Sequence, residues 1–288
     1  MDTGSSTVWF PWNTRGLLLS ESLTFPELSV DNFTVGCSVS SVHVPEGGIV
    51  GFGRTGQSLP SQMDLESFSY CLQLQDNTTV SSDLVLTTKE TKGSRATEYT
   101  TPFLQNPNVS SHPAFLEYYY VSVQKICVGK VNVKVPSGYL VPATNGSGGT
   151  IVDSGTTLTF MEKPMFDLVA REFVKQVANN YSRATEAEKE LGLGLCYDVS
   201  GKQSLDYIPG LSFYFQGGGK MVLPLENYIV RYSGGICLAI ITSIPAAKGK
   251  VWQGPAMILG NILQQNFYMD YDLKNNRLGF QKQECKRG

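Results

Sequence analysis

The chain has 288 residues, of which 41% are hydrophobic and 17% are charged, and its formal net charge at pH 7 is −2. This length allows two domains of ordinary size, and the sparse, balanced charge gives no electrostatic case for binding nucleic acid or an anionic membrane surface. No apolar run is long enough to span a bilayer. We therefore expect neither nucleic acid nor membrane as a partner.

The first part of the chain is expected to form short strands separated by turns. Apolar and β-branched runs within residues 5–37, 68–74 and 82–87 favour an all-β architecture. One brief helix is expected at residues 58–63, because Ser58 can cap it and a proline follows early. Residues 101–114 contain three prolines among Asn and Ser and read as a linker, so we place a boundary there, between residues 1–112 and 113–288.

The second part is also mainly strands. Residues 118–135 predict a strand pair that turns at Gly129 and Lys130, with the tyrosine run at its start packing in a sheet rather than stacking on a ligand. Residues 164–179 predict the one convincing helix, because apolar residues repeat at helical spacing. The chain is expected to finish with a hairpin at residues 267–280, where Asp270 and Asp272 are expected to be solvated charges.

One stretch in each half carries candidate chemistry: an aspartate, a hydroxyl, a glycine and further hydroxyls. The two copies are Asp2-Thr3-Gly4-Ser5-Ser6 and Asp153-Ser154-Gly155-Thr156-Thr157. Each is followed later by an apolar pair and a glycine, Ile49-Val50-Gly51 and Ile258-Leu259-Gly260. A single copy would be an ordinary turn, but two copies with matching flanks and matching echoes indicate a repeated device.

These motifs, together with Phe68-Ser69-Tyr70-Cys71-Leu72 and Gly47-Gly48-Ile49-Val50-Gly51, make the chain similar to pepsin-type (A1) aspartic peptidases. The resemblance is closest to the plant nepenthesin-like branch and covers nearly the whole chain. It implies a mainly β, bilobal acid-protease fold with a few short helices. The N-terminal lobe would be residues 1–112, shortened and without its flap, and the C-terminal lobe residues 113–288.

The resemblance implies an aspartic-type endopeptidase that cleaves peptide bonds through a water activated by an aspartate dyad. Asp2 and Asp153 would be catalytic, because two carboxyls at close range share a proton, as is well known for aspartic proteases. The residues expected to support the catalytic loops are Thr3, Gly4, Ser5, Ser154, Gly155 and Thr156. The polypeptide substrate would lie between the lobes of a monomer, with no metal or other cofactor.

Six cysteines are spread along the chain without a Cys-x-x-Cys pair, and only two histidines could join them, so zinc binding is not expected. Disulfides fit better, although reduced buried thiols remain an open alternative. The resemblance implies the pairs Cys196–Cys237 and Cys71–Cys285. It leaves Cys37 without a partner and Cys127 unassigned.

The first lobe departs from the family. The interval from Asp2 to Gly51 is 51 − 2 = 49 positions, against 260 − 153 = 107 positions from Asp153 to Gly260. No Tyr-Gly-Asp-Gly flap segment is present, and only Met1 precedes Asp2 where a strand leads into Asp153. We therefore expect a loosely held Asp2 loop and weak or absent activity.

An alternative function is a non-catalytic, protease-like binding protein resembling the plant xylanase inhibitors, since loss of the flap argues against catalysis. The resemblance also implies a secreted or vacuolar glycoprotein, although no secretory leader precedes the first aspartate loop. Five N-glycosylation sequons agree with that location, but chance explains them about equally well. They begin at Asn32, Asn77, Asn108, Asn145 and Asn180.

Overall fold

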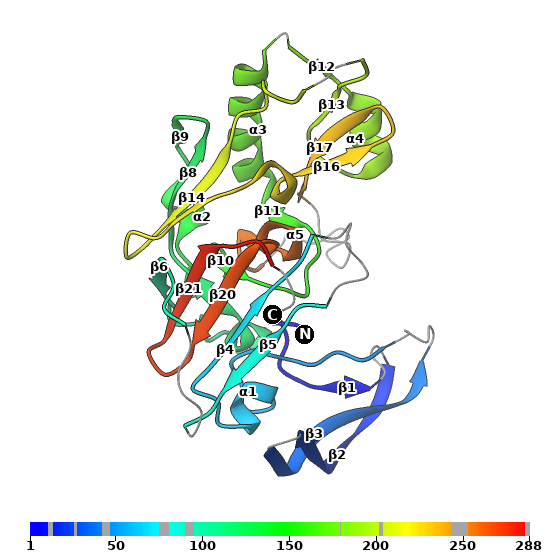
Figure 1. Cartoon of the computed structure of the whole chain (residues 1–288), viewed down its shortest axis with the longest axis vertical. Helices are drawn as coiled ribbons and strands as arrows, with labels where there is room; N and C mark the ends of the chain where they lie inside the picture. The colour runs from blue at the N-terminus through cyan, green and yellow to red at the C-terminus, as the bar shows by residue number, and fades with distance from the viewer. Residues whose placement is uncertain are drawn as a thin grey trace.

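The computed structural model is mostly β, which confirms the predicted fold class. Sheets of three to five strands form the body of the molecule, and one long helix and several short ones pack among them (Figure 1). The described residues are 1–10, 14–25, 28–41, 47–74, 81–89, 95–178, 180–201, 204–242 and 253–285.

A central five-stranded sheet joins segments that are far apart in the sequence, with the order β5-β4-β20-β21-β6. The C-terminal hairpin of β20 and β21, which the sequence predicted, thus lies inside this sheet beside β4 (Figure 1). The strands are Leu84–Thr87 (β5), Ser67–Cys71 (β4), Phe267–Asp272 (β20), Arg277–Lys282 (β21) and Tyr99–Pro102 (β6).

The prediction that Asp270 and Asp272 are solvated is wrong. Their exposed fractions are only 5% and 7%. β20 pairs with β4 on one side and with β21 on the other, so it is an interior strand whose side chains are covered. The carboxylate of Asp272 is held there by hydrogen bonds from Asn275 and from Arg277.

A second five-stranded sheet, of order β18-β11-β19-β10-β7, carries the second aspartate loop. Tyr119 and Tyr120 of β7 are fully buried in it, which confirms that the tyrosine run packs in a sheet. The strands are Ile240–Ile241 (β18), Thr159–Met161 (β11), Met257–Leu259 (β19), Thr150–Val152 (β10) and Tyr119–Val121 (β7).

Two four-stranded sheets lie further along the second half of the chain. The first, β15-β14-β8-β9, contains the predicted strand pair turning at Gly129 and Lys130. Its strands are Lys220–Val222, Leu211–Phe215, Val123–Val128 and Val131–Val133. The second, β12-β13-β17-β16, is formed by Ser182–Arg183, Cys196–Asp198, Gly235–Leu238 and Ile229–Tyr232.

The long helix α3 (Lys163–Val177) confirms the helical periodicity, because it buries Phe166, Val169, Phe173 and Val177. Helix α1 (Leu59–Gln62) also forms as predicted, with the side chain of Ser58 accepting a hydrogen bond from the Ser61 N–H. The other helices are α2 (Ser137–Leu140), α4 (Thr185–Leu191), α5 (Asn261–Gln264) and the 3₁₀ turns η1 (Pro113–Glu117) and η2 (Leu225–Asn227).

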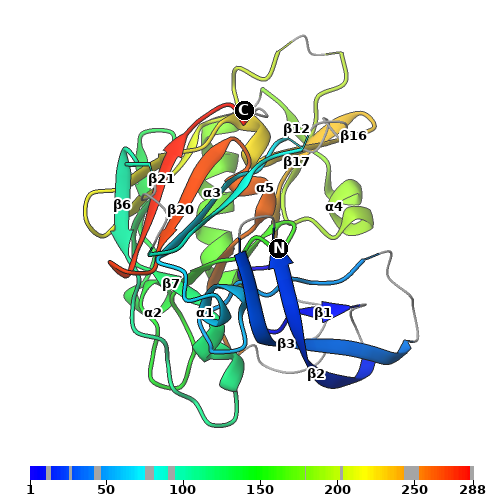
Figure 2. The same ribbon diagram turned by 60° about the horizontal axis from the view of Figure 1, so that its bottom comes forward.

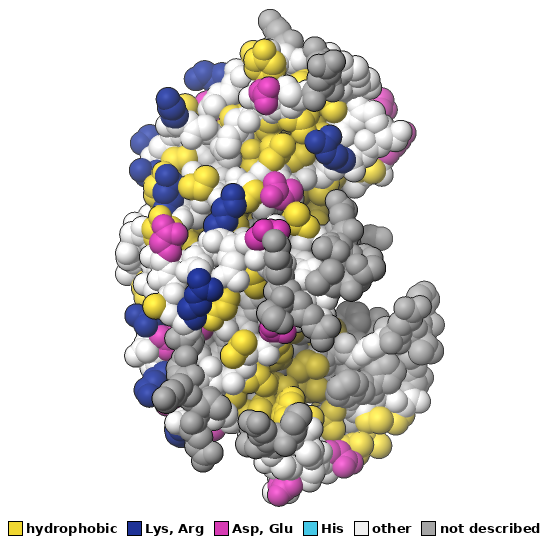
Figure 3. All heavy atoms as spheres, viewed as in Figure 1, with side chains coloured by type: hydrophobic (Ala, Val, Ile, Leu, Met, Phe, Trp, Pro, Cys, Tyr) yellow, Lys and Arg dark blue, Asp and Glu magenta, His cyan; other side chains and the backbone are white. Residues whose placement is uncertain are grey.

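The three-stranded sheet β1-β3-β2 lies at the end of the molecule opposite the sheet of β12, β13, β16 and β17 (Figures 1 and 2). An apolar groove of about 510 Å³ opens beside it, lined by Leu23, Phe33, Val50, Phe52 and Leu86 among others. Figure 3 shows hydrophobic side chains gathered in this lower part of the molecule. The strands are Trp9–Phe10 (β1), Leu28–Ser41 (β3) and Thr14–Phe25 (β2).

The prediction of a linker over residues 101–114 is wrong at both ends of that range. Its first residues complete β6, where Thr101 is fully buried, and its last residues enter η1. Only the part between them lacks regular structure. The lobe boundary at residue 112 stays a prediction.

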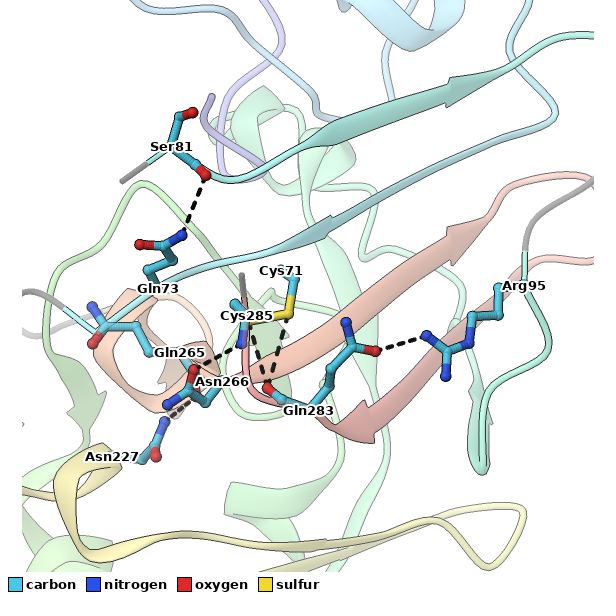
Figure 4. Close-up of a disulfide and its surroundings, with 9 residues drawn as sticks. All are labelled: Cys71, Gln73, Ser81, Arg95, Asn227, Gln265, Asn266, Gln283 and Cys285. Carbon is cyan, nitrogen blue, oxygen red and sulfur yellow. Dashed lines mark hydrogen bonds between the residues drawn. A yellow bond between two sulfur atoms is a disulfide. The ribbon is translucent and has the colours of Figure 1, made fainter. Parts of the chain in front are cut away.

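Both disulfides that the resemblance implied are present: Cys71–Cys285 and Cys196–Cys237. The first attaches the C-terminal segment to β4 beside Asn266, whose side chain accepts a hydrogen bond from the Cys285 N–H (Figure 4). Cys37, which was expected to lack a partner, and Cys127, which was left unassigned, are both free thiols.

The structure does not test the expected glycosylation or the expected secreted or vacuolar location. Of the sequon asparagines, Asn32, Asn108 and Asn145 are exposed, Asn180 is half-buried and Asn77 lies outside the described residues. None of the described helices has the length and apolar character needed to cross a membrane. Glycosylation and a secreted or vacuolar location stay predictions.

Candidate active site

The two aspartates begin their loops from equivalent backbone positions. The Asp153 N–H donates to the carbonyl of Leu259 at 3.1 Å, continuing the parallel pairing of β10 with β19. The Asp2 N–H donates to the carbonyl of Val50 at 3.0 Å. The two apolar-pair echoes seen in the sequence therefore play the same part, each supporting one aspartate.

The expectation of a loosely held Asp2 is wrong for Asp2 itself. Its carbonyl accepts the Phe52 N–H at 2.8 Å, so both of its backbone groups are paired and it forms a parallel bridge with Gly51. This single bridge takes the place of the three registered pairs between β10 and β19 in the second half.

Each carboxylate is held by its own loop in the same way. The Gly4 N–H donates to one oxygen of Asp2 at 2.9 Å, and the Ser5 hydroxyl donates to the other at 2.7 Å. In the second loop, the Gly155 N–H and the Thr156 hydroxyl donate to the two oxygens of Asp153 at 2.8 and 2.6 Å. These charge-assisted bonds fix the carboxylate planes.

Thr3 and Ser154 join the two loops to each other. The Thr3 N–H donates to the Ser154 hydroxyl at 3.2 Å, and the Ser154 N–H donates to the Thr3 hydroxyl at 2.9 Å. The Thr3 hydroxyl also donates to the carbonyl of Val152 at 3.3 Å. Both side chains are buried, so this reciprocal pair crosses between the loops without access to water.

The two carboxyl groups face one another, each against the glycine of the other loop. A Cβ atom added to Gly4 would lie 2.6 Å from Cγ of Asp153, and one added to Gly155 would lie 2.3 Å from an oxygen of Asp2. Any side chain at either glycine would collide with the opposite carboxyl. The structure thus brings together all eight residues that the sequence singled out.

The electrostatics of the pair are those of two acids that cannot both ionise easily. Burial, followed by the nearby charge of Asp2, raises the pKa of Asp153 to about 6, while hydrogen bonds from Thr156 and Gly155 oppose the rise. A proton therefore stays on Asp153 in mildly acidic solution. Asp2 is half-buried, against an exposed fraction of 8% for Asp153.

The sequence did not reveal Glu117, whose carboxylate accepts the Ser6 N–H at 2.8 Å directly after the first loop. It lies 111 positions from Ser6, and no local motif marks it. Arg54 was likewise not predicted to take part in the site. Its guanidinium donates to the carbonyl of Leu104 and to the side chains of Asn106 and Asn276, which secures the segment that follows Gly51.

The chemistry available here is acid and base catalysis by carboxyl groups. Within the described part of the chain, no three His, Cys, Asp or Glu side chains lie close enough together to hold a metal ion. The paired carboxyls, one of them protonated, are suited to activating a water and polarising a carbonyl at the same time. The catalytic roles of Asp2 and Asp153 stay predictions.

Similar solved structures share this fold. They include "Crystal structure of edgp" (TM-score 0.72, 17% identity, 98% of this chain and 87% of that one). Another is "Crystal structure of Basic 7S globulin from soybean" (TM-score 0.72, 16% identity, 99% of this chain and 89% of that one).

Curated relatives include aspartic proteinase nepenthesin-1 of Nepenthes gracilis, 33% identical over 94% of this chain and 58% of that protein. A probable aspartyl protease of Arabidopsis thaliana is 33% identical over 93% of this chain and 59% of that protein. The chain thus spans about three fifths of the length of these relatives.

Two family models match, "Xylanase inhibitor N-terminal" over residues 10–86 and "Xylanase inhibitor C-terminal" over residues 118–282. The second alone covers more than half of the chain. With the aspartate loops and the nepenthesin relatives, these matches show that the chain belongs to the plant pepsin-like (A1) family described by the xylanase inhibitor models and is a homologue of nepenthesin-like aspartic proteases.

Proposed function

We propose that this chain is an aspartic-type endopeptidase that cleaves peptide bonds with a water molecule activated by Asp2 and Asp153. The observation that carries the proposal is the reciprocal packing of each carboxyl against the glycine of the opposite loop. An aspartate that only stabilises its own turn does not need to face a second aspartate 151 residues away. It also does not need the buried reciprocal hydrogen bonds between Thr3 and Ser154 that join the two loops.

We assign the two roles from the raised pKa of Asp153. Asp2, as the carboxylate, takes a proton from the water while the oxygen of that water attacks the carbonyl carbon of the peptide. Asp153 holds a proton in acid solution because its pKa is raised to about 6, and it donates this proton to the carbonyl oxygen. The resulting diol collapses when Asp2 returns a proton to the amide nitrogen, the C–N bond breaks, and Asp153 takes a proton from the diol.

The substrate would be an extended polypeptide bound between the lobes of a monomer, and no cofactor is needed for these steps. The chain contains no tyrosine before Tyr70, so the first lobe lacks a tyrosine flap to close over the substrate. We propose that activity is correspondingly weak.

The test is cleavage of an unfolded protein substrate at acid pH, with and without a peptide inhibitor that mimics the tetrahedral diol. We expect inhibitable cleavage that falls at least about 100-fold in Asp2→Asn and in Asp153→Asn. Asp167→Asn, which alters an exposed ion pair with Lys163, is the matched control and should leave the rate unchanged. Cleavage that survives both dyad substitutions would overturn the proposal.

A second candidate is a non-catalytic binding protein similar to the xylanase inhibitors, which the matching family models and the absent flap favour. Titration of the chain into a xylanase assay distinguishes the two candidates. Inhibition of the xylanase without any proteolysis would support the binding protein, and proteolysis without inhibition would support the enzyme.

A further inference from the structure

Glu117 fastens both first-half segments that surround Asp2. Its side chain accepts the Ser6 N–H at 2.8 Å, and Ser6 directly follows Ser5, whose hydroxyl binds Asp2. Its backbone carbonyl accepts the Arg54 N–H at 2.9 Å. One residue at the end of η1 therefore ties down the loop that holds Asp2 and the segment that follows Gly51.

The packing around this contact leaves little freedom. A Cβ atom added to Gly53 would lie 2.9 Å from the carbonyl oxygen of Glu117 and 2.5 Å from the hydroxyl oxygen of Ser6. The Gly53 N–H also donates to the carbonyl of Ser5 at 2.7 Å. A shift of Glu117 would thus be transmitted directly to the residue that holds the Asp2 carboxylate.

The second loop has no counterpart of this contact. Ser6 corresponds to Thr157, since both lie four positions after their aspartate, and in the described residues no side chain accepts the Thr157 N–H. The two loops therefore donate the same hydrogen bonds to their carboxylates but differ in this contact with a third carboxyl. Within the described part of the chain, a third carboxylate accepts a hydrogen bond from the backbone just after the Asp2 loop, and no carboxylate does so after the Asp153 loop.

The charge of Glu117 acts on the same site. Burial raises the pKa of Glu117, the hydrogen bond from Ser6 opposes that rise, and the nearby charge of Asp2 adds to it. The adjacent residue Tyr118 is also titratable. Its pKa is raised to about 12, by burial first and then by the charges of Asp153, Glu117 and Asp2, so it stays neutral. The guanidinium of Arg54 is directed to other acceptors and gives Glu117 no ion pair.

We propose that Glu117 is a positioning residue for the dyad: its carboxyl oxygen fixes the Asp2 loop through Ser6, and its negative charge helps the dyad keep its shared proton as the pH rises. The inference rests on the proposed endopeptidase activity. A like charge near an acid pair makes loss of the pair's proton less favourable, so Glu117 extends activity toward higher pH.

Two substitutions separate these effects. Glu117→Gln keeps an oxygen that can accept the Ser6 N–H but removes the charge. We expect an unchanged kcat in the acid plateau and an upper limb of the pH–rate profile that moves to lower pH by up to about 1 unit. Glu117→Ala removes the acceptor as well, and we expect kcat to fall at least about tenfold at all pH values with a smaller change in KM.

The matched control is Glu162→Gln, because burial also raises the pKa of Glu162 but no charge of the dyad contributes to that rise. Its profile should superimpose on that of the parent chain. A Glu117→Gln profile that also superimposes would overturn the charge role. Full kcat in a folded Glu117→Ala would overturn the positioning role.

A separate measurement keeps this inference distinct from the proposed function. If the parent chain cleaves nothing, the endopeptidase proposal fails, but the carboxyl carbon of Asp153 can still be titrated by NMR. Glu117→Gln should lower the pKa of Asp153, and Glu162→Gln should not. An Asp153 titration that is the same in all three proteins would overturn the charge effect without any reference to catalysis.

Discussion

At the scale of single residues, burial and hydrogen bonding move the pKa values of two acids in opposite directions. Burial and the charge of Asp2 raise the pKa of Asp153. Burial also acts to raise the pKa of Asp272, but hydrogen bonds from Asn275 and Arg277 outweigh it, and the pKa is lowered. The first acid is therefore most stable in the fold when protonated, and the second when ionised.

This difference predicts how stability depends on pH. Because the folded-state pKa of Asp153 lies above its ordinary value, its stabilising effect is fully present below about pH 4 and is lost as the pH rises through about 6. We expect this group to lower the free energy of unfolding by up to about 3 kcal/mol between pH 4 and pH 7. Urea unfolding at a series of pH values measures it.

Asp153→Asn should remove this part of the pH dependence and flatten the curve. Asp272→Asn is the opposite control: its native carboxylate stabilises the fold above its ordinary pKa and loses that effect as the pH falls, so the variant should differ from the parent mainly near neutrality. A decline in stability that is equally steep in Asp153→Asn and the parent would show that Asp153 is not the group responsible.

Local spacing explains which site residues were predictable. The donors to Asp2 and Asp153 lie two and three positions after each aspartate, so one short motif contains the whole arrangement. Glu117 reaches Ser6 only through the fold, and nothing in its own neighbourhood indicates that contact. The burial of Asp270 was missed for the same reason, because a hairpin sequence does not show that its strand will become interior.

At the scale of elements, the helices and strands that could be predicted are those whose apolar residues recur at a regular spacing. Helix α3 was found because its buried residues recur at helical spacing. Helix α4 (Thr185–Leu191) was missed, and it buries no residue at all, so hydrophobic periodicity contained no signal for it. The run from Tyr119 to Val128 was read as one strand, but β7 and β8 belong to different sheets.

The packing of α3 gives a direct test at this scale. Phe173 has an exposed fraction of 0%, whereas the next residue of the helix, Val174, is 41% exposed. Phe173→Ala should lower the free energy of unfolding by about 3–5 kcal/mol, because it removes a large buried ring and leaves a cavity. Val174→Ala should change it by less than about 0.5 kcal/mol. Similar losses in both variants, measured by urea unfolding, would contradict this account of the helix.

At the scale of the whole molecule, the C-terminal hairpin unites the two halves of the chain. β20 is hydrogen-bonded to β4, which precedes it by about 200 residues, and the adjacent disulfide joins Cys71 to Cys285. The family resemblance implied the Cys71–Cys285 disulfide, whereas the order of the strands in the central sheet could not be predicted from local sequence patterns. Pairing between remote strands depends on the complete fold.

The two disulfides should therefore differ in their effect on stability. They close segments with sequence separations of 214 and 41 residues. If restriction of the unfolded chain dominates, removal of Cys71–Cys285 should cost about 5 kcal/mol and removal of Cys196–Cys237 about 4 kcal/mol. Urea unfolding of the double variants Cys71→Ser/Cys285→Ser and Cys196→Ser/Cys237→Ser, without reductant, measures both losses.

The two disulfides should also differ in their effect on the candidate active site, because they stabilise different sheets. Cys196 and Cys237 face each other within one small sheet, so the loss of that bond should leave the dyad intact. Cys71 and Cys285 hold the C-terminal segment against β4, and β4 lies in the sheet that connects segments from both halves of the chain. The proposed proteolytic activity should therefore be lost at a lower urea concentration in Cys71→Ser/Cys285→Ser than in the other double variant. The reverse order would show that the central sheet keeps the halves together without its disulfide.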